Sequence, residues 1–504
     1  MTYIVSNSSA LKPVSKAWFL CVVGMLTWFV LSFFWGERIQ AGDGLGWDGR
    51  VYAELAQADP LAWLGSRTVD IYRMSRILPS IIVHYFAQLF NYPLGQSAEV
   101  IKAFIVFNSA MIMGSTVLLY LIATHLKWSQ PVLVLGFVAL FLNFPILKHS
   151  NYNPTLTDFS AFFFGLASLY AFLKNRQLTL FLISVLAIFV WPTFLYTALP
   201  LLIFRVQKLT PTIPEPSNLS NLISALISGA VVAGALYTYY VTGLRLPNGA
   251  TQVNENVILL SAILFFTFVW LFARPLVDVT FFRLNLFRGA SWMGVILSIA
   301  LVVIFKLAIA VYSSNLTGGY SALMYVQFIG VTALVKPLIN VVSHVSYFGP
   351  AVILLFLLWK DVANIAKQYG LGLIFFLLIS GFLSIDTESR HLIAFWPVFA
   401  VLTCEALNRR GVTWVFVYTT LVAGLLTSRF WLLLNTKEPW VGAFQDFPFQ
   451  MFFMNFGPWM SDTMYVVFVA FSLILFIVLW LQMRNMGEEI CPPPSATVVS
   501  RRLD

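Results

Sequence analysis

Charged residues are scarce in this chain. Asp, Glu, Lys and Arg make up 10% of its 504 residues, whereas 59% are hydrophobic. Soluble domains are typically ~25% charged, and a soluble core stops growing at about 250–300 residues. This much apolar sequence therefore cannot be buried in a soluble core. The composition excludes a soluble enzyme, a disordered protein and a nucleic-acid-binding protein, and it predicts an all-α, polytopic bundle of membrane-spanning helices.

Cysteine and the common catalytic motifs are scarce or missing as well. The three cysteines, Cys21, Cys404 and Cys491, are too few for a disulfide framework and lack the spacing of zinc ligands. The first two lie in apolar segments, where we expect small buried side chains. The sequence contains no P-loop, no HExxH and no serine nucleophile elbow. It therefore predicts no metal-ligand set and no soluble nucleotide-binding domain.

Long apolar runs, in contrast, are abundant. A helix that crosses a bilayer needs roughly 17–25 apolar residues. Such runs are found at 17–35, 102–125, 130–147, 157–173, 178–204, 220–242, 256–273, 291–313, 345–360, 370–385, 391–407, 413–433 and 464–483. The run 178–204 has Trp191-Pro192 at its middle, so we expect two short helices that meet at the proline. Two further stretches, 77–91 and 323–341, are ambiguous.

The basic residues predict the orientation of the chain. Lys12 and Lys16 precede the first helix and place the N-terminus in the cytoplasm, because Lys and Arg concentrate in cytoplasmic loops. If 77–91 and 323–341 do not cross and 178–204 crosses twice, the later basic clusters fall on the same side. These are Lys174 and Arg176, Arg205 and Lys208, Arg274 through Arg288, Lys360 and Lys367, Arg409 and Arg410, and Arg484 with Arg501 and Arg502. This arrangement has about 14 crossings, within a range of about 11–14 helices. It forms one transmembrane domain at 1–484, with a cytoplasmic tail at 485–504.

Acidic and polar residues gather in loops on the opposite, outer face. The loop at 36–76 holds six acids, Glu37, Asp43, Asp48, Glu54, Asp59 and Asp70, and balances them with five arginines. The loop at 148–157 reads KHSNYNPTLT and leads into Asp158, and the loop at 385–391 reads IDTESRH. A fourth outer loop, at 434–463, is aromatic. We therefore expect the chemistry of this protein on the face away from the cytoplasm.

The first outer loop carries two acids among glycines. It reads GDGLGWDGRVYAELA over 42–56 and YRMSRILP over 72–79. The glycines permit tight turns that hold Asp43 and Asp48 near a ligand. The segment VYAELAQ predicts a short interfacial helix with Tyr52 on one face. Since Asp48 directly precedes that helix, capping of the helix is the alternative to a functional role.

These features resemble the GT-C glycosyltransferases, which are polytopic enzymes that use polyprenyl-phosphate-linked sugars. The similarity rests on a first transmembrane helix, the early Asp in WDGxxYxxLA, and the Arg-rich step that follows. NYNPTLTD, VWPTFLYTALPLLIF and ESRHLIAFWPVFAVL are similar to segments of bacterial-type members. The resemblance covers about 17–407. Well-known members carry adjacent acids in the first outer loop, whereas Asp43 and Asp48 are not adjacent.

The resemblance implies a membrane glycosyltransferase of the cell envelope, in a bacterial inner or plasma membrane. It would transfer a sugar with inversion to an acceptor on the outer face. Asp48, with Asp43 as the alternative, is the expected base for the acceptor's proton. The expected substrate-binding residues are Arg73, Arg76, Arg390 and His391 for the phosphate, His149, Asn153 and Asp158 for sugar hydroxyls, Tyr52 for stacking, and Lys336 and Glu388. Lys336 is included because a break in the helical stretch 323–341 would place this lysine at a cavity suited to a lipid phosphate.

Several of these residues have a structural alternative. Arg73 and Arg76 would snorkel at the membrane surface, which is common for interfacial arginines. Glu388 would pair with Arg390 at a helix end. Asn153-Pro154 would form an ordinary turn in front of a helix that Thr157 or Asp158 caps.

The sequence requires no cofactor, although Mg²⁺ or Mn²⁺ is compatible with paired carboxylates. The expected partners are a polyprenyl-phosphate-linked sugar donor, a glycan, lipid or protein acceptor, and membrane lipid, but no nucleic acid. Three other functions stay open: a polymerase or ligase of lipid-linked glycans, a transporter or lipid flippase, and a non-catalytic assembly subunit. A transporter would carry matched broken helices in two halves of the chain, and no such pair is found.

Overall fold

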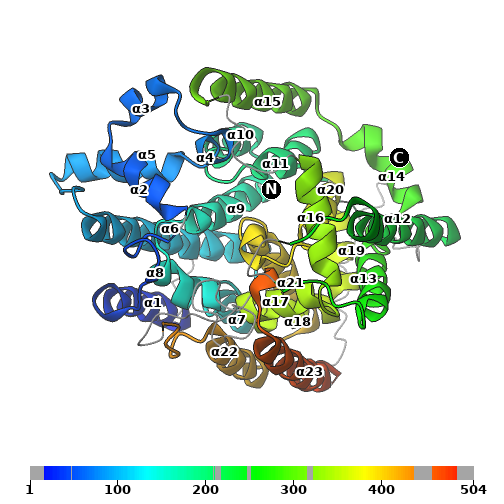
Figure 1. Ribbon diagram of the computed structural model, residues 1–504. Helices are drawn as coiled ribbons and strands as arrows, with labels where there is room; N and C mark the ends of the chain where they lie inside the picture. The colour runs from blue at the N-terminus through cyan, green and yellow to red at the C-terminus, as the bar shows by residue number, and fades with distance from the viewer. Residues whose placement is uncertain are drawn as a thin grey trace, which may run out of the picture.

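A computed structural model describes residues 16–46, 48–207, 209, 217–246, 251–314, 322–435 and 457–484 (Figure 1). Within these ranges the chain is helical, and its only extended pairing is an isolated bridge between Phe204 and Ala290. The all-α fold is thus confirmed for the described residues. The tail expected at 485–504 and most of the aromatic loop at 434–463 lie outside them.

The described residues form many helices of different lengths. In chain order they are α1 (Lys16–Trp35), α2 (Gly49–Gln57), α3 (Pro60–Ser66), α4 (Ile71–Met74), α5 (Leu78–Leu89), α6 (Ser97–Leu126), α7 (Gln130–Phe141), η1 (Pro145–His149), α8 (Ser150–Tyr152), α9 (Asp158–Leu173), α10 (Gln177–Ala187), α11 (Phe194–Ile203), α12 (Asn218–Tyr237), η2 (Thr238–Thr242), α13 (Ile258–Ala273), α14 (Val279–Gly289), α15 (Trp292–Tyr312), α16 (Ala322–Leu334), α17 (Ile339–Phe348), α18 (Pro350–Leu357), α19 (Trp359–Tyr369), α20 (Leu371–Leu383), η3 (Ser389–Leu392), α21 (Trp396–Arg410), α22 (Trp414–Ser428), η5 (Gly457–Trp459) and α23 (Asp462–Arg484).

Five described helices are long and apolar enough to cross a membrane: α1, α6, α12 with η2, α15 and α23. Two bent pairs qualify as broken spans, namely Gln130–Phe141 with Pro145–Tyr152 and Leu323–Leu334 with Ile339–Phe348. Seven further apolar helices have 10–17 residues. The chain is therefore a multi-pass membrane protein, and the number of crossings stays a prediction.

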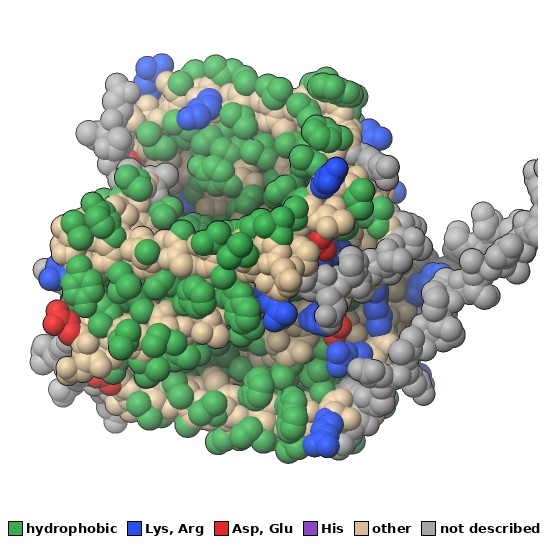
Figure 2. Space-filling model, turned by 90° about the vertical axis from the view of Figure 1, so that its right-hand side faces the viewer, with side chains coloured by type: hydrophobic (Ala, Val, Ile, Leu, Met, Phe, Trp, Pro, Cys, Tyr) green, Lys and Arg blue, Asp and Glu red, His purple; other side chains and the backbone are tan. Residues whose placement is uncertain are grey.

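Three of the long helices stand at the rim and several shorter ones at the centre. In Figure 1, α15, α23 and α1 lie at the periphery, whereas α9, α17 and α21 lie inside. Nearly every residue of α9 and α21 is buried, whereas α15 buries only Gly294, Ser298 and Leu301. Figure 2 shows one side of the molecule covered almost entirely by apolar side chains. Such a surface is stable against lipid and would be costly against water.

The breaks predicted from proline are present. The run 178–204 forms α10 and α11, which are interrupted around Trp191-Pro192 as expected. The stretch 323–341 is broken too: the chain turns by 93° between α16 and α17. Lys336-Pro337 lies in that turn, and Leu338 adopts a left-handed φ of 50°. Proline ends a helix because it lacks the amide hydrogen and its ring clashes with the preceding turn.

Two other expected spans are also divided, which the apolar pattern alone did not reveal. The run 130–147 bends by 54° after α7, and Pro145 opens the π-helical turn η1. The run 345–360 is split at Gly349-Pro350, where Gly349 has a φ of 75° that favours glycine. The short helix predicted at VYAELAQ is confirmed as α2, and α3 and α4 follow it in the same loop.

Close backbone packing brings the three outer segments together. A Cβ on Gly49 would lie 2.0 Å from Oγ1 of Thr155, so α2 starts directly against the NYNPTLTD turn. A Cβ on Gly165 would lie 2.1 Å from the carbonyl oxygen of Ala394, so α9 packs against the chain that follows η3. Only glycine permits such approaches. They set the first outer loop, the NYNPTLTD turn and the ESRH segment side by side.

Candidate functional site

Asp48 points toward arginines instead of capping α2. Its backbone has φ −68° and ψ −29°, which is helical, whereas a capping residue needs an extended conformation. Its side chain makes no capping hydrogen bond, and its Oδ1 lies 3.8 Å from Nη2 of Arg73. The capping alternative is therefore wrong for Asp48. Asp43, in contrast, is exposed in a turn with a φ of 56°.

Arg73 is held beside Asp48 by a second acid. Asp70 caps α4 by accepting a hydrogen bond from the amide of Arg73 at 2.9 Å, and its other oxygen pairs with the Arg73 guanidinium. Asp48 and Asp70 thus share one cation. The Arg73 side chain is one-third exposed, which places it at the rim of the cluster.

Arg76 lies deeper, between two aromatic rings. Its guanidinium carbon is 4.2 Å from the ring centroid of Tyr72 and 4.4 Å from that of Trp191. The side chain is buried, so the surface-snorkelling alternative is wrong for Arg76. Trp191 lies in the break between α10 and α11. Its contact with Arg76 therefore holds that break next to the first outer loop. Stacking of this kind holds a guanidinium in a fixed plane.

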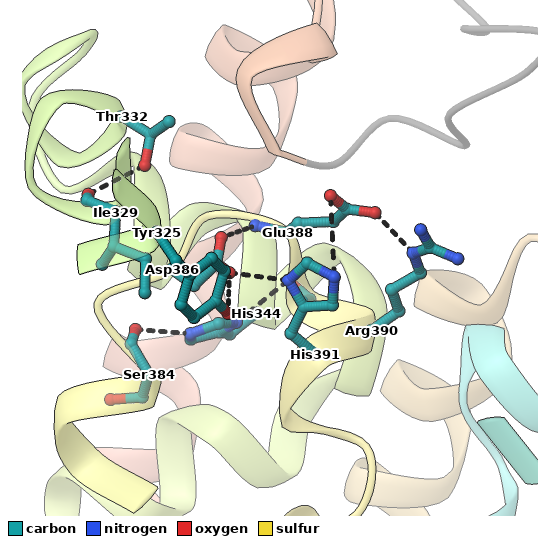
Figure 3. A network of polar contacts seen from close by, with 10 residues as sticks. Tyr325, Ile329, Thr332, His344, Ser384, Asp386, Glu388, Arg390 and His391 are labelled. Carbon is teal, nitrogen blue, oxygen red and sulfur yellow. Dashed lines mark hydrogen bonds and ion pairs between the residues drawn. The ribbon is translucent and has the colours of Figure 1, made fainter. Parts of the chain in front are cut away.

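The ESRH segment forms a chain of charged contacts, shown in Figure 3. Glu388 pairs with Arg390, as the structural alternative predicted, and its other oxygen lies 3.9 Å from Nε2 of His391. His391 donates from Nδ1 to Asp386 at 2.6 Å. Asp386 also accepts from the Tyr325 hydroxyl at 2.9 Å and from the Glu388 amide at 2.9 Å. Both cations of this segment are therefore held by carboxylates.

Burial and charge act in opposite directions on these groups. Burial alone would raise the pKa of Glu388, but Arg390 and His391 hold that pKa below its ordinary value. Burial alone would lower the pKa of His391, but Glu388 and Asp386 outweigh it and raise that pKa above 6.5. The two carboxylates thus favour the imidazolium form of His391, beside the guanidinium of Arg390.

Asp158 faces this cluster from the first turn of α9. Its side chain is 1% exposed, and neither carboxylate oxygen has a hydrogen-bond partner within the described part of the chain. It interacts electrostatically with Arg390, Arg76 and His391. Thr157, at the cap position, makes no capping hydrogen bond, so the expected cap is absent.

Other buried polar atoms of the same segments also lack partners among the described residues. They are Oδ1 of Asn153, Oγ1 of Thr157, Oγ1 of Thr387, and Nε of Arg73 and Arg76. Buried polar groups nearly always have a hydrogen-bond partner, so a group of them in one place is typical of a binding site. The acceptors and donors present suit a ligand that carries both hydroxyl and anionic groups.

Three candidates from the sequence have other contacts. His149 is buried and shares a hydrogen bond of 2.8 Å with the hydroxyl of Tyr347. Asn153 packs its amide against Gly46 of the first outer loop. Lys336 pairs with Asp462 at 2.6 Å and donates to the carbonyl oxygen of Met460 at 3.0 Å. These contacts of Lys336 are with the start of α23, not with the arginines.

Sequence reasoning missed four members of this cluster. Tyr72 and Trp191 enclose Arg76, and Tyr325 and Asp386 position His391. Asp386 lies within the outer IDTESRH loop, so its acidity and position were available signals. Tyr72 was part of the YRMSR segment, but nothing in the sequence pairs its ring with Trp191. Tyr325 lies in an ordinary apolar helix and gave no signal.

The residues described include no group of three or more His, Cys, Asp or Glu side chains arranged to hold a metal ion. Since Mg²⁺ is often bound by one or two carboxylates together with a substrate phosphate, the divalent metal that the sequence left open stays a prediction.

No protein-family model and no curated protein sequence matches the chain. Among solved structures, it is similar to the crystal structure of the Archaeoglobus fulgidus oligosaccharyltransferase in complex with Zn and sulfate. The identity is 12% and the TM-score 0.40, over 91% of this chain and 53% of that one. It is also similar to the archaeal oligosaccharyltransferase AglB from Archaeoglobus fulgidus in complex with an inhibitory peptide and a dolichol-phosphate. There the identity is 11% and the TM-score 0.39, over 94% and 56% of the two chains. The present chain spans about half the length of these structures.

Proposed function

We propose that this protein is a membrane glycosyltransferase of the GT-C kind, which transfers a sugar from a polyprenyl-phosphate-linked donor to an acceptor. One observation carries the proposal: Asp48 lies 3.8 Å from Arg73 and interacts electrostatically with Arg390, whose charge also acts on Arg76 and His391. In a chain with 10% charged residues, such a concentration of buried charge is costly unless it serves a function. A carboxylate beside several cations matches the needs of transfer from a phosphate.

Asp48 is the proposed general base. In the reaction, the acceptor oxygen forms a bond to the anomeric carbon of the sugar, and the bond between that carbon and the phosphate oxygen breaks. The acceptor's proton passes to Asp48, and the bonding electrons leave with the phosphate. A base placed in this way contributes typically ~10²–10⁴-fold. Attack from the side opposite the phosphate gives inversion.

The cations are the proposed phosphate-binding groups. Arg76 presents a guanidinium fixed between two rings, and Arg390 and His391 are held by Glu388 and Asp386. Positive charge arranged before the reaction stabilises the negative charge that develops on the leaving phosphate. Glu388 acts through Arg390, so we assign it as a positioning residue.

The remaining polar groups would bind the sugar. Asp158 has two carboxylate oxygens without partners among the described residues, and Asn153 has one such oxygen. These oxygens would accept hydrogen bonds from sugar hydroxyls. His149 would act on the site through its hydrogen bond to Tyr347. Lys336 is not part of the proposed site, because it is paired with Asp462.

A test needs the purified chain in lipid nanodiscs with a panel of polyprenyl-phosphate sugars. Release of polyprenyl phosphate, followed by mass spectrometry, should depend on Asp48 and Arg390. Glu54→Gln is a matched control, because Glu54 is an exposed acid on α2, next to the site but outside it. Turnover that is unaffected by both Asp48→Asn and Arg390→Gln would refute the proposal. The length of the transferred glycan separates a monosaccharide transferase from a polymerase or ligase.

The proposal places this site on the outer face of the membrane, away from the cytoplasm. It is supported by the basic residues that cluster at the opposite ends of the helices, such as Arg409 and Arg410 in the last turn of α21. Single cysteines introduced at the exposed positions Asp43 and Lys360 would report the orientation. We expect a membrane-impermeant thiol reagent to label the first from outside and the second only after permeabilisation.

A further inference from the structure

An apolar groove lies along the bundle, separate from the charged cluster. Its volume is about 940 Å³. One wall is α13, from Leu264 to Pro275, and the other is α23, from Tyr465 to Phe476, with residues of α17, α18 and α21 also lining it. Figure 2 shows the side of the molecule on which α13 lies, covered with apolar side chains and hollowed between its ridges.

The groove has the length of one lipid chain in one leaflet. The lining stretches of α13 and α23 each extend about 16 Å at ~1.5 Å per residue. The hydrocarbon core of a bilayer is about 30 Å thick, so this is about half of it. An acyl chain that entered from one leaflet would fill the groove without crossing the membrane.

The charge at the groove is confined to one end. Among the described residues that line it, Arg274 and Lys360 are the only charged ones, and no carboxylate lines it. Arg274 donates from Nε to Oδ1 of Asn221 at 3.0 Å, and no described carboxylate pairs with either cation. Trp359 also lines this end, as expected at a membrane–water interface. The end thus suits an anionic headgroup at the membrane surface.

No described cation lines the opposite end: Lys336, 5.3 Å from the Tyr465 ring there, is paired with Asp462. His344 lines it, but its Nε2 donates to the carbonyl oxygen of Ser384 at 2.8 Å and its Nδ1 is bonded to Oγ of Ser389 at 2.9 Å. The 13 residues of α20 connect the region near Lys367 to Ser384 and rise about 20 Å. Arg73, Arg76, Arg390 and His391 do not line the groove, so a phosphate at Arg274 and Lys360 would lie outside the proposed active site.

We propose that this groove binds an anionic phospholipid, with its phosphate at Arg274 and Lys360 and one acyl chain directed toward His344. The end of the acyl chain would then pack against His344. His344 is hydrogen-bonded to Ser389, which precedes Arg390 in the ESRH segment. The bound lipid would support the proposed active site from the opposite side. This site does not depend on the reaction proposed above.

The test compares two phospholipids with the same acyl chains, phosphatidylglycerol and phosphatidylcholine. Native mass spectrometry of the full chain, released from detergent, measures how many of each remain bound and at what affinity. We expect phosphatidylglycerol to bind about tenfold to thirtyfold more tightly, since each cation near an anionic headgroup favours it. Arg274→Gln with Lys360→Gln should remove this preference. Ser472→Trp, which fills the groove from α23, should lower the affinity for both lipids.

The matched control is Lys174→Gln with Arg176→Gln, which removes the same charge from the junction of α9 and α10. These two residues do not line the groove, so the preference should persist, and thermal unfolding without lipid should confirm that each variant folds. Equal binding of the two lipids to the unaltered chain would overturn the proposal. The proposal would also fail if the control pair removed the preference for phosphatidylglycerol as fully as Arg274→Gln with Lys360→Gln does. It would fail as well if Arg390→Gln removed the preference and the Arg274 and Lys360 substitutions did not.

Discussion

Asp48 lies 3.8 Å from Arg73, although capping of α2 would have turned its carboxylate the other way. Arg73 is already held by Asp70, so Asp48 is not needed to neutralise it. A carboxylate that neither caps its helix nor supplies the main partner of its neighbour is available to accept a proton. The proposed catalytic role of Asp48 can therefore be tested without a large effect on the stability of the fold.

Replacement of Asp48 by Asn should therefore abolish transfer without unfolding the protein. We expect a loss of at least ~10²-fold in turnover, as for removal of a general base. Thermal unfolding of the purified variant should be within about 0.5 kcal/mol of the unaltered chain, since no cap or buried pair is lost. Turnover and thermal unfolding should be measured on the same preparation. A loss of turnover with unchanged unfolding supports the prediction, and unchanged turnover contradicts it.

The rival base supplies the control. Asp43→Asn should leave turnover nearly unchanged, because Asp43 is exposed and asparagine also tolerates the left-handed backbone at that position. If Asp43→Asn were as damaging as Asp48→Asn, the assignment of the base to Asp48 would fail.

The stacking of Arg76 predicts a difference between arginine and lysine. Arg76→Lys keeps the charge but loses the planar group that fits between Tyr72 and Trp191. We expect the affinity for polyprenyl phosphate to fall about tenfold, since stacked and forked contacts are each worth on the order of 1 kcal/mol. Titration of the purified protein with polyprenyl phosphate alone measures this without any chemistry. Unchanged affinity in Arg76→Lys would show that only the charge matters there.

The sequence predicted the parts of this site that depend on local pattern. Glycines around Asp48, the proline after Trp191 and the acids of IDTESRH each indicated a loop or a break, and each lies where expected. The sequence could not predict which side chains meet, because that depends on packing between distant helices. The position of Tyr325 beside Asp386 and that of Trp191 over Arg76 come from such packing. Lys336 shows the same limit: the break around it was predicted, but its partner Asp462 was not.

The raised pKa of His391 predicts a dependence of stability on pH. The folded state holds the proton more tightly than the unfolded chain, whose histidine has a pKa near ~6.5. This contribution to stability is fully present below about pH 6.5 and is lost as the pH rises through the pKa of the folded state. The facing groups that set the pKa are Asp386 and Glu388, opposed by burial and by Arg390, with Asp158 across the cluster.

Removal of one facing acid should shift that dependence. Asp386→Asn should move the loss of stability to lower pH, whereas Tyr325→Phe removes a hydrogen bond but no charge and should shift it little. Thermal unfolding followed from pH 5 to pH 9 for the three proteins measures the effect. An identical pH profile for Asp386→Asn and the unaltered chain would show that Asp386 does not hold the imidazolium.

Glu37, at the start of the first outer loop, forms a buried ion pair with Lys148 of η1. Nζ of Lys148 lies 2.6 Å from Oε2 of Glu37, and both side chains are less than one-tenth exposed. Glu37 also accepts hydrogen bonds from the amides of Leu434 and Asn435. Loss of one partner of a buried pair costs about 3–5 kcal/mol, because a charge is left without compensation.

The two single substitutions should not be equal. Lys148→Met leaves the carboxylate of Glu37 with its two amide donors, whereas Glu37→Leu leaves an ammonium and two amides without their acceptor. We therefore expect Glu37→Leu to lower the unfolding temperature more than Lys148→Met. The double variant should be less destabilised than the sum of the two, since it leaves no unpaired charge. Equal effects that add in the double variant would mean that the ion pair does not join these segments.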